Sequence, residues 1–203
     1  MGCLPDCSRQ AGTYTHKDSS LSIKDFLKEE FGFATETRVV GLLDCAVVHF
    51  REAYLAFEDL DKATGKREVF AMVCLLDYKP NDYYNIGYKD MEESEGPYYY
   101  NCPERILKLL TPTSNDYALR WRKKCWERIE RRKSMSRLTQ GDVIEFEKPL
   151  PFSDGTEQSR LQLVDDSKKR GFLRFQNPDS GLYYAVSREL LISTPFKVIK
   201  NAA

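Results

Sequence analysis

The chain has 203 residues, of which 41% are hydrophobic, so it can form one domain of ordinary size or one domain with a small appendage. Its 31 basic and 31 acidic residues balance, which argues against a protein that coats nucleic acid but allows a local basic face. No apolar run is long enough to span a membrane, and the opening MGCLPDCSRQ lacks the apolar core of a secretory signal. We therefore expect a cytoplasmic protein without a membrane partner.

Cysteine and histidine are too sparse to predict a metal centre. The chain has six cysteines and two histidines, and among the cysteines Cys3 and Cys7 form the one close pair. A zinc knuckle needs a second such pair. Cys45 and Cys74 lie in apolar, strand-like stretches, where a free thiol packs as a small hydrophobic group. We expect reduced thiols, no metal and no cofactor.

The first part of the chain predicts a helix followed by an antiparallel sheet. Residues 1–18 are polar and are expected to be poorly ordered, and an apolar helical stripe then follows and ends at Gly32. Apolar runs predict strands at 38–50, 52–59 and 68–78, with a tight turn between the last two. This order favours a meander with a buried central strand.

The middle of the chain is dominated by the stretch 82–112, which holds six tyrosines, an acidic cluster and several turn-forming residues. We interpret it as a packed, irregular segment that the flanking elements hold in place. A short helix is predicted within it at 103–110. A longer helix, DYALRWRKKCWERIERRKS, follows. Its expected core-facing stripe consists of Tyr117, Trp121, Cys125 and Ile129.

The last part of the chain has a different texture. Residues 134–140 are interpreted as a linker, and short strands separated by Gly, Asp and Pro turns occupy 141–203. This spacing predicts a barrel of about five strands of the SH3 or OB kind. The same composition also fits a sheet packed on the first domain. The expected fold class is α+β, with an N-terminal antiparallel sheet and helices at 19–133 followed by a C-terminal small β-barrel.

The central and C-terminal parts contain five distinctive strings: DYYNIGYKDM, GPYYYNCP, ILKLLTPT, RWRKKCWE and GDVIEF. Together they resemble an uncharacterised family of small proteins carried by phages and mobile elements of bacteria. The likeness begins near Leu42 and runs to the C-terminus. The family has no assigned activity, so the resemblance implies a genomic setting and no mechanism. That setting favours a role in DNA upkeep or in blunting host defence over a role in core metabolism.

The tyrosine-rich stretch is the first candidate site. Carboxylates in one loop can hold Mg²⁺ or share acid–base work, and exposed tyrosines can stack on bases or contact a protein. The competing interpretations are a solvated acidic loop and tyrosines that belong to the core. The predicted partner-binding contacts are Tyr88, Asp90, Glu92, Glu93 and Tyr98.

Three further residues near this stretch are given structural roles. Tyr99 and Ile106 are expected to be buried, so their truncation should destabilise the protein. Cys102 precedes a proline at a helix start, where the helix dipole could lower the pKa of its thiol. No histidine lies near Cys102 in sequence to activate it, so no catalytic residue is assigned.

The long helix is the second candidate site. Nine basic and two acidic residues lie between Tyr117 and Arg137. Such a face either contacts phosphates or is solvated and paired with acids elsewhere in the chain. The predicted nucleic-acid-binding residues are Arg120, Lys123, Lys124, Arg128 and Arg131.

Hypotheses from different functional classes follow from these sites. The first is a non-enzymatic binding protein of phage or mobile-element origin, which acts on a nucleic-acid complex or inhibits a host defence protein. Its partner would be a host or phage protein, alone or bound to nucleic acid. The alternative is a metal-assisted enzyme with its site in the acidic, tyrosine-rich loop 83–100. A structural or assembly factor is the third hypothesis.

Overall fold

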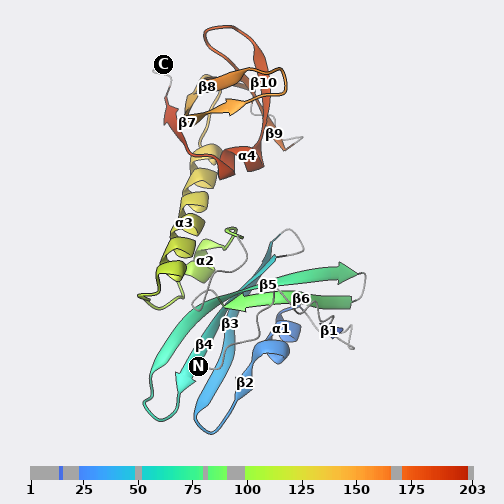
Figure 1. Cartoon of the computed structure of the whole chain (residues 1–203), viewed down its shortest axis with the longest axis vertical. Helices are drawn as coiled ribbons and strands as arrows, with labels where there is room; N and C mark the ends of the chain where they lie inside the picture. The colour runs from blue at the N-terminus through green and yellow to red at the C-terminus, as the bar shows by residue number, and fades with distance from the viewer. Residues whose placement is uncertain are drawn as a thin grey trace. The chain divides into compact units, whose positions relative to one another are not determined.

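The computed structural model describes residues 14–15, 23–48, 52–79, 82–90, 99–165 and 171–200. The chain divides into two compact units, which we call unit 1 (Met1–Trp126) and unit 2 (Glu127–Ala203). Each unit contains its own antiparallel sheet, and strands outweigh helices in both (Figure 1). The expected mixture of α and β structure is therefore confirmed. The expectation of a poorly ordered segment at 1–18 lies outside the described residues, apart from 14–15.

Unit 1 is built on six strands in the order β1-β6-β5-β4-β3-β2. Four of them are long, and a two-residue strand lies at each edge. The strands are β1 (Tyr14–Thr15), β2 (Phe33–Ala34), β3 (Arg38–Val48), β4 (Glu52–Asp61), β5 (Arg67–Lys79) and β6 (Asp82–Asp90). The predicted meander with a buried central strand is confirmed by β3, β4 and β5.

Strand β6 corrects the interpretation of 82–112 as irregular throughout. Its residues pair with β5 from Lys79↔Asp82 to Met72↔Asp90, with one register shift between Leu75 and Leu76. Tyrosine is a favoured strand residue, and the β5–β6 ladder satisfies backbone groups that an irregular segment would leave unpaired. The first part of the stretch is therefore a regular strand.

Helix α1 (Ile23–Phe31) packs on one face of this sheet. Alternate residues of β4, namely Ala53, Leu55 and Phe57, point to this face and are fully buried with Leu27. As predicted, the helix ends at Gly32, whose N–H donates to the Lys28 carbonyl at 2.9 Å. Burial of these side chains holds α1 to the sheet.

The opposite face of the sheet is also buried. Tyr54 and Ala56 point to it from β4, and their register partners on β5, Val73 and Ala71, are buried beside them. The short helix α2 (Glu104–Leu107) contacts β3 and β4 and buries its Ile106 and Leu107 side chains. The unit 1 sheet is therefore covered by a helix on each face.

Helix α3 (Asp116–Ser136) crosses the boundary between the two units. Three of the four residues of its predicted stripe, Trp121, Cys125 and Ile129, are buried. The helix ends at Ser136, so it includes the first three residues of the segment that we interpreted as a linker at 134–140, and Leu138 is buried in the core of unit 2. The structure therefore places the end of a helix and an apolar anchor within this segment, and the domain boundary that we expected there stays a prediction.

Unit 2 contains five strands in the order β10-β9-β8-β7-β11 and one short helix. The elements are β7 (Val143–Pro151), β8 (Glu157–Asp165), β9 (Phe172–Gln176), β10 (Tyr183–Ser187), α4 (Arg188–Ser193) and β11 (Phe196–Ile199). The edge strands β10 and β11 are not hydrogen-bonded to each other in the described part of the chain, so the predicted barrel is not closed. Helix α4 connects these two strands and places Leu191 in the core.

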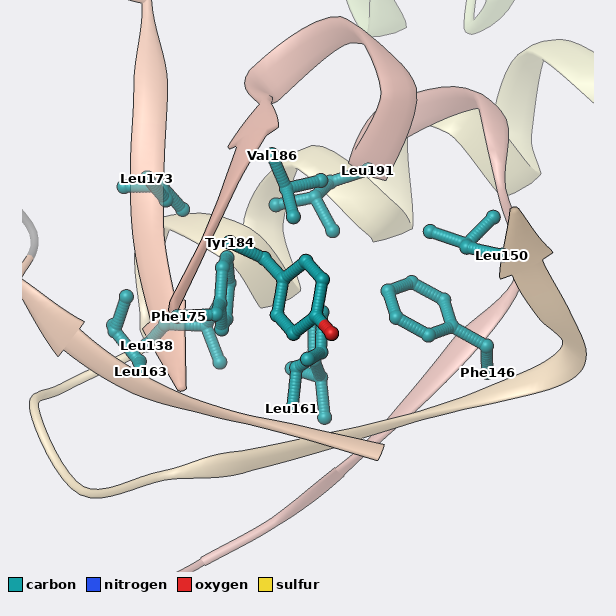
Figure 2. Packing of buried hydrophobic residues seen from close by; sticks show 11 residues of the cluster. Leu138, Phe146, Leu150, Leu161, Leu163, Leu173, Phe175, Tyr184, Val186 and Leu191 are labelled. Atoms are coloured by element: carbon teal, nitrogen blue, oxygen red, sulfur yellow. The ribbon is translucent and has the colours of Figure 1, made fainter. Parts of the chain in front are cut away.

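The core of unit 2 is apolar, and the buried carboxylate of Asp142 lies at its edge. Figure 2 shows the rings of Phe146, Phe175 and Tyr184 pointing into the same interior. At its edge, Asp142 accepts hydrogen bonds from the Thr139 N–H at 2.8 Å and from the Thr139 hydroxyl at 3.0 Å. The Lys200 ammonium lies 2.6 Å from the same carboxylate oxygen. These contacts tie the segment before β7 to the segment after β11.

Candidate nucleic-acid interface

The first half of α3 is held in unit 1 by its apolar side. Asn115 caps the helix, because its side-chain oxygen accepts a hydrogen bond from the Ala118 N–H at 3.0 Å. Ala118, Trp121 and Cys125 are buried. The Trp121 indole N–H donates to the Tyr99 carbonyl at 2.9 Å. The helix is therefore fixed against the segment 99–111, and its other side remains free to face solvent.

Two sets of hydrogen bonds fix the segment 99–111 to the unit 1 sheet. The Asn101 N–H donates to the Tyr54 hydroxyl at 2.9 Å, and that hydroxyl donates to the Glu52 carboxylate at 2.6 Å. Burial raises the pKa of Tyr54, and the hydrogen bond to Glu52 raises it further. Farther along, the Thr111 N–H donates to the Val69 carbonyl at 3.0 Å. The segment therefore serves as a fixed support for α3.

Three of the predicted phosphate-contacting residues lie exposed on the first half of α3. They are Arg120, Lys123 and Lys124. Positions three and four apart lie on the same side of a helix, so these three cations share one face. This basic α3 face, as we name it, is opposite the buried stripe.

A tyrosine lies beside the basic α3 face. The Lys124 ammonium is 4.9 Å from the centre of the Tyr100 ring and 3.3 Å from its hydroxyl. A cation over an aromatic ring is attracted by the negative face of the ring. The contact therefore holds Lys124 at the surface next to an aromatic group. Tyr100 was not among the predicted site residues, although the run of three tyrosines at 98–100 was a signal for it.

The other two predicted residues, Arg128 and Arg131, have internal partners in unit 2. Arg128 forms an ion pair with Glu189 of α4, and 12% of its side chain is exposed. Arg131 donates from Nε to the Ile192 carbonyl at 2.6 Å, and 18% of its side chain is exposed. Desolvation lowers the pKa of Arg131, and the neighbouring carboxylate of Glu127 opposes this effect. These two arginines contact α4, and their assignment to a nucleic-acid interface stays a prediction.

The tyrosine-rich candidate site is described only in part. Tyr88 and Asp90 lie on β6, in register with Cys74 and Met72 of β5. Glu92, Glu93 and Tyr98 lie outside the described residues. The predicted partner-binding site and the alternative enzyme site at 83–100 therefore stay predictions.

The residues that we expected to be buried near this stretch have different outcomes. Ile106 is fully buried, as predicted, but 37% of Tyr99 is exposed. The prediction for Tyr99 is wrong because its backbone carbonyl, which accepts the Trp121 indole N–H, makes the inward contact. Cys102 is fully buried, and burial raises the pKa of its thiol well above the ordinary value. The suggestion that a helix dipole lowers this pKa is therefore also wrong.

The described ranges also bear on two other kinds of site. They contain no group of three His, Cys, Asp or Glu side chains that could hold a metal ion. Among the helices described, none is both long and apolar enough to cross a membrane.

The comparisons with known proteins give one family match. The family model of a domain of unknown function (DUF6927) matches residues 112–189, which run from the approach to α3 into α4. Neither the curated proteins nor the solved structures contain a significant match. The matched segment carries all five predicted phosphate-contacting residues and is consistent with an uncharacterised family. Residues 112–189 are thus similar to a domain whose function is unknown.

Proposed function

We propose that this chain is a non-enzymatic binding protein that contacts nucleic acid through the basic α3 face. The observation that carries the proposal is the exposure of Arg120, Lys123 and Lys124 on one side of a helix whose other side is buried. Lysine and arginine on such a face neutralise phosphates and release counterions. The buried stripe fixes the helix, so the cations are presented on a rigid support.

The proposal extends to the setting and to unit 2. The five strings that resemble phage and mobile-element proteins support a role on a nucleic-acid complex of such an element. In unit 2 the last strand, β11, returns beside the first, β7. This order supports a partly open relative of the predicted small barrel, a class that includes folds that bind oligonucleotides.

A matched pair of triple variants tests the proposal. The test variant replaces Arg120, Lys123 and Lys124 by alanine. The control variant replaces three exposed cations of the β4–β5 hairpin in the same unit by alanine: Lys62, Lys66 and Arg67. Both variants lose the same net charge. Binding of labelled DNA and RNA to the full chain is measured by fluorescence anisotropy over a range of salt concentrations.

The test variant should bind at least about tenfold more weakly than the unaltered protein. The slope of the logarithm of its binding constant against the logarithm of the salt concentration should be shallower by about two to three, since each lost phosphate contact contributes about 0.7 to 0.9 to this slope. The hairpin variant should bind like the unaltered protein. Equal weakening of both variants would show a response to net charge alone. Absence of binding to any nucleic acid at low salt would overturn the proposal.

A further inference from the structure

The outer face of β9 and β10 in unit 2 carries exposed aromatic rings. Strand residues alternate between the two faces of a sheet, and in β9 Leu173 and Phe175 point into the core (Figure 2). Phe172 and Arg174 therefore point outward from β9. On β10, Tyr184 and Val186 point inward, and Tyr183 points outward. We call Phe172, Arg174 and Tyr183 the outer platform.

The rings of the outer platform are strongly exposed. Phe172 is 52% exposed and Tyr183 is 65% exposed. Aromatic side chains usually bury most of their surface, so two exposed rings on the outer face of one strand pair are candidates for a binding contact. The other exposed positions of these two strands are Arg174 and Ala185.

The strand register fixes the spacing of the platform. Tyr183 lies opposite Gln176, and Phe172 lies opposite Ser187. Residues two apart on a strand are separated by roughly 6.7 Å, and neighbouring strands lie about 4.8 Å apart. The two rings are therefore attached to the sheet roughly 14 Å apart, with Arg174 between them.

A rigid turn supports Tyr183. The Asn177 side chain accepts hydrogen bonds from the Asp179 N–H at 2.7 Å and the Ser180 N–H at 2.8 Å. Gly181 has a φ of 73°, which favours glycine, and its carbonyl accepts a hydrogen bond from the Gln176 side chain at 2.9 Å. The ring of Tyr183 thus leaves a turn that is already ordered, which lowers the entropic cost of binding.

The charged side chains of this sheet face nearly balance, and one cation, Arg174, lies between the two rings. The side chains that alternate to the outer face include three cations, Arg160, Arg174 and Lys197, and two acids, Glu145 and Asp165. Arg160 lies 3.9 Å from Glu145, so these two largely balance each other. Arg174 lies opposite Asp165 in the strand register, and its side chain is exposed between the rings, where it can contact a phosphate.

We propose that the outer platform binds single-stranded nucleic acid, with Phe172 and Tyr183 each stacking on an unpaired base and Arg174 contacting the backbone between them. Unpaired bases can be splayed onto aromatic side chains, whereas the bases of a duplex are stacked on each other. This inference rests on the proposed function and deepens it, because it names the class of nucleic acid and a second contact surface.

The test compares ring variants of the full chain. Phe172→Ala and Tyr183→Ala should each weaken binding of a short labelled single strand by about tenfold, which is within the range for loss of one stacked base. Tyr183→Phe keeps the ring and should restore binding to within about twofold of the unaltered protein. Leu182→Ala is the matched control, because Leu182 is 53% exposed beside Tyr183 but has no ring. Thermal melting of each variant checks that it is folded.

A second readout locates the contact. Photo-crosslinking of a single strand that carries 4-thiouridine, followed by mass spectrometry, should identify peptides that contain Phe172 or Tyr183. Binding of a blunt duplex should be unchanged in both alanine variants. Equal losses of duplex and single-strand binding in these variants would overturn the assignment to unpaired bases.

The two proposals fail in different ways. If the unaltered protein binds no nucleic acid, both are wrong. If the alanine variants of Arg120, Lys123 and Lys124 weaken binding while the ring variants do not, the outer platform is overturned and the proposed function stands. Binding of an acidic peptide in place of any oligonucleotide, lost in Tyr183→Ala, would assign the platform to a protein partner and overturn the inference.

Discussion

The two halves of α3 carry four cations each, yet the structure uses them in opposite ways. In unit 1, three of the four, Arg120, Lys123 and Lys124, are exposed on one face. In unit 2, Arg128 and Arg131 point to α4 and are largely covered. A basic run in sequence therefore combines residues that are available to a ligand with residues that complete the fold.

The halves also differ in what holds them. The first half is anchored by buried Ala118, Trp121 and Cys125 and by one indole hydrogen bond. The second half is anchored by buried Ile129 and by guanidinium groups that bind a carboxylate and a carbonyl. Arginines that anchor the helix are not available to a ligand, whereas the exposed Arg120, Lys123 and Lys124 are. Substitutions in each half should therefore have distinct effects.

The largest effect is expected for the apolar anchor. Trp121→Ala should lower the free energy of unfolding by about 3–5 kcal/mol, because it leaves a cavity and an unpaired carbonyl at Tyr99. Denaturant unfolding measures this loss. Leu119→Ala, on the exposed face of the same half, is the control and should change stability by less than about 0.5 kcal/mol. Similar losses in both variants would contradict the one-sided anchoring of this half.

The next effect concerns the polar anchor. Arg131→Ala should cost about 2 kcal/mol, since it removes a largely buried hydrogen bond from a charged group to the Ile192 carbonyl. Nucleic-acid affinity of the folded variant should stay within about twofold of the unaltered protein, because an arginine that is largely covered and bound to the Ile192 carbonyl is not available to a phosphate. An Arg131→Ala variant that kept full stability but lost nucleic-acid binding would show that Arg131 contacts the nucleic acid.

The stability that the Asp142 carboxylate gives to unit 2 should depend on pH. Desolvation raises the pKa of Asp142, but the Lys200 ammonium and the Thr139 N–H and hydroxyl outweigh it and lower this pKa to about 2. The folded pKa lies below the unfolded value of 3.8, so this stabilisation is present above about pH 4 and is lost as the pH falls towards 2. The difference in melting temperature between the unaltered protein and Asp142→Asn should shrink over this range. A constant difference down to pH 2 would show that the carboxylate is not held as described.

The smallest effect is expected on the basic α3 face itself. Lys123→Ala should change the free energy of unfolding by less than about 0.5 kcal/mol, because the side chain is exposed and alanine is a strong helix former. Thermal melting at neutral pH measures this change. A loss comparable to that of Arg131→Ala would mean that Lys123 has a structural partner.

Periodicity predicted most elements of the fold. The stripe of Trp121, Cys125 and Ile129 identified the buried side of α3, and the apolar runs identified the meander of unit 1. These patterns involve residues close together in the chain, so they can be recognised from the sequence alone. The pairing of β6 with β5 is also local, because Asp82 lies opposite Lys79, whereas the open edges of unit 2 depend on contacts between distant residues.

The candidate site was less predictable for the same reason. Arg128 and Arg131 look like Lys123 and Lys124 in sequence, and their partners lie 61 residues away in α4. The sequence did not identify the exposed rings of the outer platform, because they lie in short strands whose buried face depends on the sheet register. Sequence patterns identify which residues can bind a ligand, and the tertiary partners decide which of them are free to do so.

The pairing of β11 with β7 has a consequence for how unit 2 is made. Phe196 to Ile199 complete a sheet whose first strand begins at Val143, and Lys200 reaches Asp142 across 58 residues. During synthesis, β7 to β10 leave the ribosome before the strand that covers the free edge of β7. Until then that edge is a template for pairing with another chain, and the Asp142 carboxylate lacks its cation. Unit 2 therefore acquires its protected form only after the segment containing Lys200 has emerged.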